Sequence, residues 1–306
     1  MTKQDIDGIL IIDKPPEFTS MNVVRAIKRI THAKKAGHVG TLDPLATGVL
    51  PICLGQATRF VDYYVDDRKN YLAEIRLGFA TDTYDSQGET IHQGKYEHLS
   101  IENITKAMLS FEGVILQRPP MFSALKRDGT RLYNLARAGV EIDIPLRSVV
   151  VHTITIESWN PPFLNVEISC GKGFYVRSFA HDLGLELGSY AHLSQLRRIK
   201  SGIFNIEDTI PLDELEAGNT WNEIIDTPDR GLLQMKSFNV NTLLESKFQN
   251  GQALSFLNEP LDAAHLEVRR VYSEERCFLG LAKFDRSTNS WKPEKVLTKP
   301  LLSKYA

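Results

Sequence analysis

Cysteine is scarce in this sequence, and long apolar runs, internal repeats and low-complexity segments are missing. The three cysteines, Cys53, Cys170 and Cys277, are far apart and odd in number, so they form neither a disulfide framework nor a zinc-ligand spacing. No run approaches membrane-spanning length, and the N-terminus shows no cationic start followed by an apolar signal core. We therefore expect a soluble, cytoplasmic protein without membrane contacts or repeat architecture.

The overall composition is that of a globular protein, but its charges are segregated along the chain. The 306 residues are 42% hydrophobic and 24% charged, which leaves room for one large domain and a small one. Although the net charge is only −2, residues 21–42 include five basic side chains and no acid, whereas residues 205–229 include eight acids and no base. A locally basic surface is what binds phosphate, so the basic segment is compatible with a nucleic-acid partner. The same pattern of charges also occurs on helix faces that are merely solvated.

The stretch GHVGTLDPLATGVLPICLG, residues 37–55, contains a single acid, Asp43, among glycine, threonine, proline and aliphatic residues. Its glycines and prolines are too frequent for an ordinary long helix. Two interpretations of Asp43 compete. In one, Asp43 caps a short helix that begins at Pro44. In the other, it is a nucleophile or base kept dry by aliphatic neighbours and approached through the basic segment.

Hydrophobic periodicity predicts a mixture of strands and helices in the first half of the chain. An apolar run at 8–12 predicts a buried strand, and alternation over 71–79 predicts a strand with one buried face. Thr19 or Ser20 is expected to cap one helix, and Ser100 another. The side chains expected to face inward on these helices are Val23, Val24, Ile27 and Ile30, and then Ile101, Ile104, Met108 and Phe111.

Basic side chains lie on the outer side of the first helix and again in the loop and short helix expected at 117–139. On the helix, Arg25, Lys28 and Arg29 stand opposite the apolar stripe. Single-stranded nucleotides bind to surfaces that interleave basic and aromatic side chains, and a surface hairpin with snorkelling arginines has the same composition. The interleaved residues of the second region are Arg118, Phe122, Lys126, Arg127, Arg131, Tyr133 and Arg137.

In the second half, strands at 149–159 and 163–170 are expected to pair antiparallel, followed by a glycine turn and a helix that ends at Gly188. At the start of that helix, Arg177 could hold a carboxylate with both arms of its guanidinium, or form an exposed ion pair worth about 0–1 kcal/mol. His181 and His192 have no metal-ligand motif between them, so we expect no metal site. Runs at 266–272 and 276–284 predict a small β domain beyond Ser237.

Several motifs occur in a fixed order along the chain. The longest is KAGHVGTLDPLATGVLPICLGQATRF at 35–60, which is far more specific than a short glycine pattern. The others are Lys14-Pro15, K-x-Y at 69–71, TDTYDSQG at 81–88, CGKGFYVRSFAHDLG at 170–184, LRR at 196–198, and a C-terminal segment that resembles a PUA domain. With these motifs the chain resembles the bacterial TruB family of tRNA pseudouridine synthases over its full length.

This resemblance implies isomerisation of uridine 55 in the tRNA T loop to pseudouridine, without a cofactor or metal and with the base flipped into a cleft. Asp43 falls on the catalytic aspartate, Tyr71 on the tyrosine that stacks on the base and is a candidate for removing the C5 proton, and Arg177 on the arginine that pairs with the aspartate. The implied substrate-binding residues are His38, Asp85, Tyr175 and Leu196. The implied contacts with the RNA backbone are Arg25, Lys28, Arg29, Lys126 and Arg131.

The same resemblance implies an α+β fold, a mixed and mostly antiparallel sheet with flanking helices, followed by a small β-rich PUA-like domain. The implied catalytic domain spans 1–236, with an RNA-gripping insertion at 113–147, and the PUA-like RNA-binding domain spans 237–306. The expected partner is the T-arm stem-loop of tRNA, with no guide RNA, and the expected oligomeric state is a monomer.

Two positions depart from the family pattern. Pro16-Glu17 stands where the family usually has glycine in the turn after Lys-Pro, so this turn could have a different shape. His181-Asp182 stands where two acids are usual, which could alter the ion pairs around Arg177 or introduce pH sensitivity.

Overall fold

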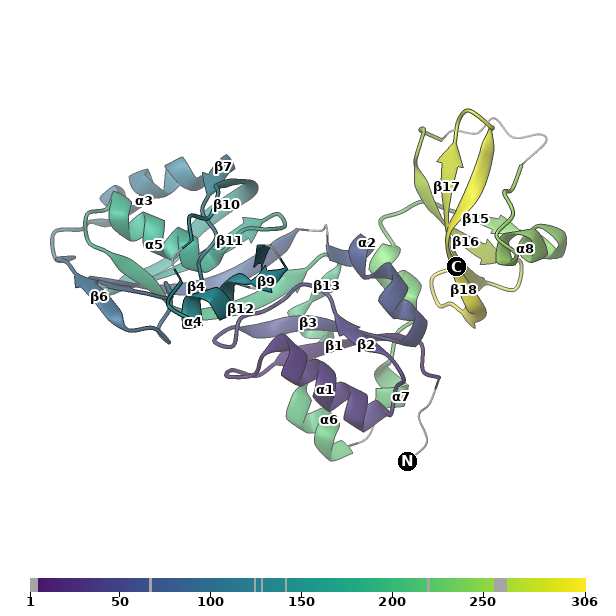
Figure 1. The fold of residues 1–306 in the computed structure, drawn as a ribbon, viewed down its shortest axis with the longest axis horizontal. Helices are drawn as coiled ribbons and strands as arrows, with labels where there is room; N and C mark the ends of the chain where they lie inside the picture. Colours follow the sequence, from purple (N-terminus) through teal and green to yellow (C-terminus); the bar gives the residue numbers. More distant parts are fainter. Residues whose placement is uncertain are drawn as a thin grey trace.

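The computed structural model of the chain describes residues 5–306 apart from 66–67, 124, 128, 141, 219–220 and 256–262. Within these residues, the main body is one sheet of ten strands with helices on its flanks, and a separate four-stranded sheet follows (Figure 1). Eight of the ten strands lie in a row, in the order β14 (Ile210–Pro211), β1 (Gly8–Lys14), β3 (Thr47–Leu54), β12 (Ala191–Ser201), β4 (Lys69–Leu77), β11 (Phe163–Cys170), β10 (Arg147–Asn160) and β7 (Gly113–Gln117). The other two, β2 (Ala36–His38) and β13 (Phe204–Asn205), pair with β3 and β12.

Two halves of this sheet meet at a narrow joint between β3 and β12. β1 and β3 pair antiparallel along seven residues, and β12 pairs with β4 along nine. Between the halves, however, β3 and β12 pair in parallel only at Thr47 with Arg197 and at Gly48 with Arg198. Gly48 has φ +98°, and a Cβ there would lie 2.2 Å from the carbonyl oxygen of Arg198. The close approach of the two backbones therefore requires glycine at this position.

Each half of the sheet carries its own helices (Figure 1). α1 (Ser20–Thr31) and α6 (Leu212–Gly218) pack together near β1 and β3, while α3 (Ile101–Met108) and α5 (Val176–Glu186) cover the half formed by β4, β10, β11 and β12. None of the helices in the described residues is long and apolar enough to cross a membrane.

The sheet contains the parallel pairs β1–β14 and β3–β12, and its other pairs are antiparallel. This arrangement confirms the predicted mixed, mostly antiparallel α+β fold. Other short elements of this body are α2 (Val61–Val65), β5 (Phe79–Thr81), β6 (Thr90–Gln93) and α7 (Trp221–Ile224).

α1 forms where its capping residue and apolar spacing predict it. The Thr19 hydroxyl accepts the backbone N–H of Asn22, and the Asn22 side chain accepts the N–H of Thr19, which satisfies two free donors of the first turn. Val23 and Ile27 are buried, while the basic side chains point outward. The prediction for the second helix was partly wrong, because Ile101 at its start is exposed.

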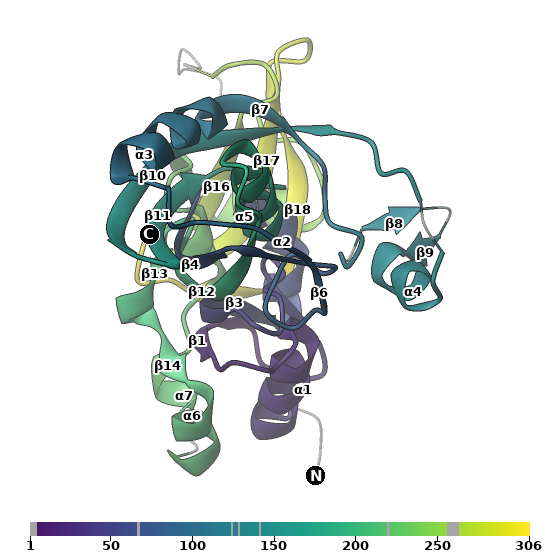
Figure 2. The same ribbon diagram turned by 90° about the vertical axis from the view of Figure 1, so that its left-hand side faces the viewer.

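The predicted insertion at 113–147 divides into two parts. Its first strand, β7, pairs with β10 and is the edge of the main sheet. The rest includes the short pair β8 (Lys126–Arg127) and β9 (Thr130–Arg131) and the helix α4 (Leu132–Arg137), which stand away from the body of the sheet (Figure 2). The side chains of Lys126 and Arg131 lie outside the part of the chain that the structure describes.

The C-terminal β domain forms a second sheet, in the order β15 (Ser237–Val240), β16 (Val268–Ser273), β17 (Cys277–Asp285) and β18 (Ser290–Leu302), beside α8 (Thr242–Gln249). Its attachment to the main body includes buried apolar contacts: Phe60 packs against Phe278 with ring centres 5.5 Å apart. The Tyr272 hydroxyl donates to the buried carboxylate of Asp229, 2.7 Å away. These contacts fix the small sheet against the larger one.

Candidate active site

The loop between β2 and β3 presents Asp43 at the joint of the two half-sheets. No helix begins at Pro44: Pro44 and Leu45 form a bend that leads into β3, and the Ala46 N–H donates to the Asp43 carbonyl oxygen at 3.1 Å. The interpretation of Asp43 as a helix cap was therefore wrong. Residues 43–46 form only a tight turn, because the chain must enter β3 at once.

Three contacts from the β1–α1 connection hold this loop. The Ser20 hydroxyl and the backbone of Leu42 exchange hydrogen bonds of 2.8 and 2.9 Å. The Lys14 ammonium, fully buried, donates to the carbonyl oxygens of Pro15 and Pro44. The Glu17 N–H also donates to Pro44, and Glu17 takes φ +64°, a left-handed conformation that suits glycine better. Glu17 therefore adopts the backbone conformation that glycine would have in this turn, and this conformation is strained for a residue with a side chain.

Arg177, at the start of α5, forms an ion pair with Asp43. Its Nε lies 2.9 Å from Asp43 Oδ2, and its Nη1 lies 3.5 Å from Asp85 Oδ2. The same guanidinium donates to the carbonyl oxygens of Phe122 (2.8 Å) and Thr83 (3.2 Å) and is only 4% exposed. Because it is held on several sides, Arg177 presents a fixed positive charge to the Asp43 carboxylate, which is 33% exposed.

Burial and nearby charges act in opposite directions on Asp43. Removal from water raises the pKa of the carboxyl group above its usual value, and the neighbouring Asp85 carboxylate adds to this rise. The Arg177 guanidinium opposes it most strongly, and Lys14 does so more weakly. The net direction is upward, so the carboxylate form depends on the cations that surround it.

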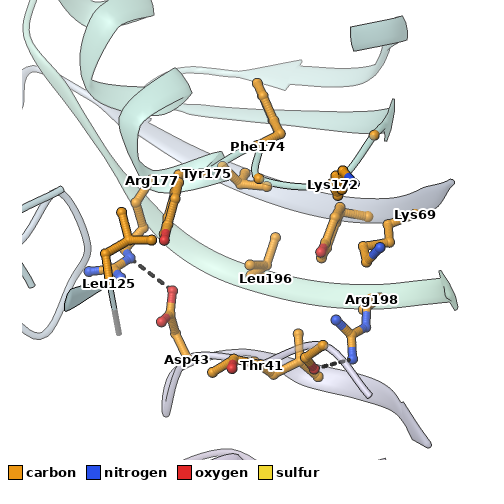
Figure 3. Close-up of a pocket in the computed structure, with 16 residues that line it drawn as sticks. Thr41, Asp43, Lys69, Leu125, Lys172, Phe174, Tyr175, Arg177, Leu196 and Arg198 are labelled. Carbon is orange, nitrogen blue, oxygen red and sulfur yellow. Dashed lines mark hydrogen bonds and ion pairs between the residues drawn. The ribbon is translucent and has the colours of Figure 1, made fainter. Parts of the chain in front are cut away.

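A cavity of about 320 Å³ opens beside Asp43 (Figure 3). Tyr71 on β4 and Leu196 on β12 line it from adjacent strands, and Tyr175 and Arg177 line it from α5 and the turn before it. Its size is at the low end of the range for small-molecule sites. The structure therefore brings the three predicted catalytic residues to one pocket, together with Tyr175 and Leu196.

A second, larger groove of about 720 Å³ shares Asp43 and Arg177 with this pocket. His38, Asp85 and Arg25 line this groove and are not among the residues that line the smaller cavity. The basic residues of α1 have different surroundings. Arg25 lines the groove, whereas Arg29 forms an ion pair of 2.9 Å with Glu216 in the acidic tract at 205–229. The functional roles of all these residues remain predictions.

His181 does not enter the ion pairs of Arg177 that the described residues form. Its ring stacks on Tyr84, with centres 3.9 Å apart. Burial and the nearby His92 lower the pKa of His181, so the imidazole is neutral at physiological pH.

Sequence reasoning gave no role to two buried cations at the site, Lys14 and Arg198. Both were present only as parts of the Lys-Pro and LRR motifs. Arg198 lines the cavity beside Tyr71 although its side chain is fully buried. A run of basic residues such as LRRIK gives no sign of which member points into the protein.

The buried Lys14 gives a prediction about stability and pH. Burial lowers the pKa of Lys14 from 10.5 to about 8 in the folded chain, against an opposing effect of Asp43. Between these pH values the Lys14 side chain holds more protons in the unfolded chain than in the folded chain, so Lys14 contributes a rise in the free energy of unfolding with pH across this window. Lys14→Met should remove this rise. Denaturant unfolding of both proteins at pH 8 and pH 10 measures it, and an equal rise in the variant would contradict the assignment.

Comparison with known proteins identifies the family. Residues 28–176 match the TruB family pseudouridylate synthase N-terminal domain, and residues 177–237 match the tRNA pseudouridylate synthase B C-terminal domain. The chain is 42% identical over 293 residues to tRNA pseudouridine synthase B of Clostridium acetobutylicum, an alignment that covers 96% of this chain and 100% of the relative. The chain belongs to the TruB family of pseudouridylate synthases.

Other TruB relatives match over a similar length. The tRNA pseudouridine synthase B of Dehalococcoides mccartyi is 38% identical over 306 residues, which cover 98% of this chain and 100% of the relative. Among solved structures, a Cbf5–Nop10–Gar1 complex matches with a TM-score of 0.71 and 27% identity, over 94% of this chain and 84% of that one. Family membership and the pseudouridine synthase activity predicted from the motifs are thus confirmed.

Proposed function

We propose that this enzyme converts uridine 55 in the T loop of tRNA to pseudouridine, with Asp43 as the catalytic carboxylate. The observation that carries the proposal is the ion pair of Asp43 with Arg177 at the mouth of a pocket lined by Tyr71 and Leu196. The curated relatives in this family carry the name tRNA pseudouridine synthase B, which supports tRNA as the substrate.

The target uridine must leave its folded loop to reach a pocket of this kind. Extruding a nucleotide costs a few kcal/mol, and stacking a base on an aromatic ring returns about 1–3 kcal/mol. Tyr71, Phe174 and Tyr175 line the pocket, and we propose that the base stacks on Tyr71; Leu196 from the adjacent strand lines the same space.

The chemistry breaks the N1–C1′ bond of uridine, turns the uracil, and joins C5 to C1′. C5 then loses its proton and N1 gains one, so atoms and charge balance without an external reactant. The carboxylate of Asp43 fits three roles: attack on C1′, attack on C6, and assistance to elimination that forms a glycal. In each role Arg177 keeps the carboxylate ionised and oriented, and the Tyr71 hydroxyl is the candidate acceptor of the C5 proton.

Two segments rich in basic residues lie on either side of the site, and their charge is suited to the phosphates of a T arm. The outer face of α1 leads to the groove through Arg25. The segment of β8, β9 and α4 projects from the opposite half of the sheet (Figure 2). We propose that these two surfaces bind RNA backbone, that the second sheet extends this surface as a PUA-like domain, and that the chain acts as a monomer.

Tritium release from a T-arm stem-loop labelled at C5 of uridine tests the proposal. We expect release from naked RNA without an added guide, and no release when cytidine replaces uridine 55. Tight RNA binding without release would favour the alternative of a tRNA-binding protein that has lost its chemistry. A requirement for guide RNA would favour a ribonucleoprotein enzyme.

The basic face of α1 gives a prediction about salt. Lys28→Gln should weaken binding of the T-arm RNA and reduce the slope of log affinity against log salt by about one, which corresponds to one phosphate contact. Arg29→Gln should have a smaller effect because Glu216 already neutralises Arg29. Fluorescence anisotropy across a salt series measures both. Lys106→Gln on α3, which faces solvent elsewhere, is the matched control, and an equal change in this variant would contradict the proposal.

A further inference from the structure

Arg198 lies at the joint where the two half-sheets meet, and its side chain is fully buried. The backbone there provides only two residue pairs between β3 and β12. Arg198 belongs to one of these pairs, on β12, so its side chain starts from one half of the sheet. Its backbone hydrogen-bond acceptors belong to the other half.

The guanidinium bridges the joint by binding both ends of the loop that carries Asp43. Its Nε donates to the carbonyl oxygen of Val49 at 2.8 Å, and its Nη2 donates to the carbonyl oxygen of Gly40 at 3.1 Å. Gly40 precedes Asp43 and Val49 follows it. Figure 3 shows the side chain of Arg198 beside this loop, across the pocket from Arg177. The Arg198 side chain therefore holds the two ends of the loop together.

Two glycines allow this close contact. Besides Gly48 at the joint, Gly40 has φ +72°, and a Cβ on it would lie 3.3 Å from Nη1 of Arg198. Gly40 is thus constrained by its conformation and by the guanidinium at the same time.

Arg198 also faces Tyr71, its partner in the β12–β4 ladder. Burial raises the pKa of Tyr71, and the charge of Arg198 and its hydrogen bond to Tyr71 oppose this rise. The ion pairs found among the described residues include none with Arg198. Its contacts are therefore with the backbone of the catalytic loop and with the ring that faces the pocket.

The Asp43–Arg177 ion pair crosses the same joint. Asp43 is attached to β3, while Arg177 is attached through α5 to the half that contains β12. The 2.9 Å separation between them depends on how the halves are held together. We propose that Arg198 is a positioning residue for the reaction: it fixes the loop of residues 40–49 against β12, so that Asp43 meets Arg177 and the target uridine beside Tyr71. The reaction named here is that of the proposed function.

The first test compares Arg198→Lys with the wild type in tritium release from the T-arm RNA. A lysine can keep one of the two carbonyl contacts but not both. Because a displacement of about 1 Å at a catalytic group costs about 100-fold, we expect kcat to fall about 10- to 100-fold while KM changes less than about threefold. In combination with Arg177→Met the two losses should be less than multiplicative, since both act on Asp43. An unchanged kcat, a loss confined to KM, or fully multiplicative losses would overturn the proposal.

A second measurement does not depend on activity, so it separates this proposal from the proposed function. The carboxyl carbon of Asp43, assigned by its absence in Asp43→Asn, is titrated by ¹³C NMR. If Arg198 holds Asp43 at Arg177, the pKa of Asp43 rises in Arg198→Lys. An unchanged pKa would overturn the proposal, whereas absence of wild-type turnover would overturn only the proposed function.

Gly40→Ala provides the same test without removal of the buried charge, in case Arg198→Lys does not fold. The added methyl group pushes on the guanidinium from the loop side. We expect a kcat loss and a rise in the pKa of Asp43 in the same directions as for Arg198→Lys. A folded Gly40→Ala with wild-type kcat and wild-type Asp43 titration would overturn the proposal.

Discussion

Asp43→Asn is expected to reduce tritium release from the T-arm RNA by about 10⁴-fold or more, the scale seen when a covalent catalytic group is removed. The amide has nearly the same size as the carboxyl group but can act neither as a nucleophile nor as a base. Affinity for the RNA, measured by fluorescence anisotropy, should stay within about threefold because Asp43 provides no cationic contact with phosphate.

Asp62→Asn is the matched control for this variant, since Asp62 lies exposed on α2 away from the pocket. It should retain wild-type turnover. If Asp43→Asn also retained wild-type turnover, the carboxylate would serve only the structure of the loop, and the catalytic assignment would fail.

Arg177→Met is expected to lower kcat by about 10²–10³-fold, the range for loss of one preorganised charge at a reacting centre. It should also move the acid limb of the pH–rate profile. Burial raises the pKa of Asp43 and Arg177 is the strongest opposing charge. Its removal raises that pKa further, so activity should be lost at a higher pH as the solution is acidified.

The measurement is kcat as a function of pH for wild type, Arg177→Met and Arg177→Lys. Lysine keeps the positive charge but lacks the fork that contacts Asp43, Phe122 and Thr83. Its acid limb should therefore lie between those of the other two proteins. A defect of Arg177→Met that appears only as weaker RNA binding, with kcat and the acid limb unchanged, would contradict this account.

Local signals in the sequence were sufficient where neighbouring residues determine the structure. A capping residue at Thr19 or Ser20 and the spacing of Val23 and Ile27 predicted α1, and the alternation around Tyr71 predicted β4. The alternation was extended too far, because Gly78, with φ +95°, ends the strand and Phe79 begins β5. The positions of Asp43, Tyr71 and Arg177 in one pocket followed from the family resemblance and not from periodicity.

Non-local contacts explain most of what was missed. Asp-Pro is a good local signal for a helix start, but the pairing of β3 with β1 and β12 pulls the chain into a strand directly after Asp43. Nothing in the LRR motif distinguishes Arg197, which pairs with Asp13, from the buried Arg198. That difference appears only when β12 lies between β3 and β4.

The acidic tract is a further example. Its composition is typical of solvated helix faces, yet several of its residues pack on the main body. β14 pairs in parallel with β1, Glu216 of α6 pairs with Arg29, and the backbone of Asp226 bonds to Ile9. Glu216 therefore partly neutralises the basic face of α1.

The most direct test of the central claim is a structure of Asp43→Asn bound to a T-arm stem-loop. We predict that uridine 55 is extruded, with its uracil between Tyr71 and Leu196 and its C1′ next to the side chain at position 43. A uridine that stays stacked in the RNA loop, or a base that occupies a surface away from this pocket, would contradict the account.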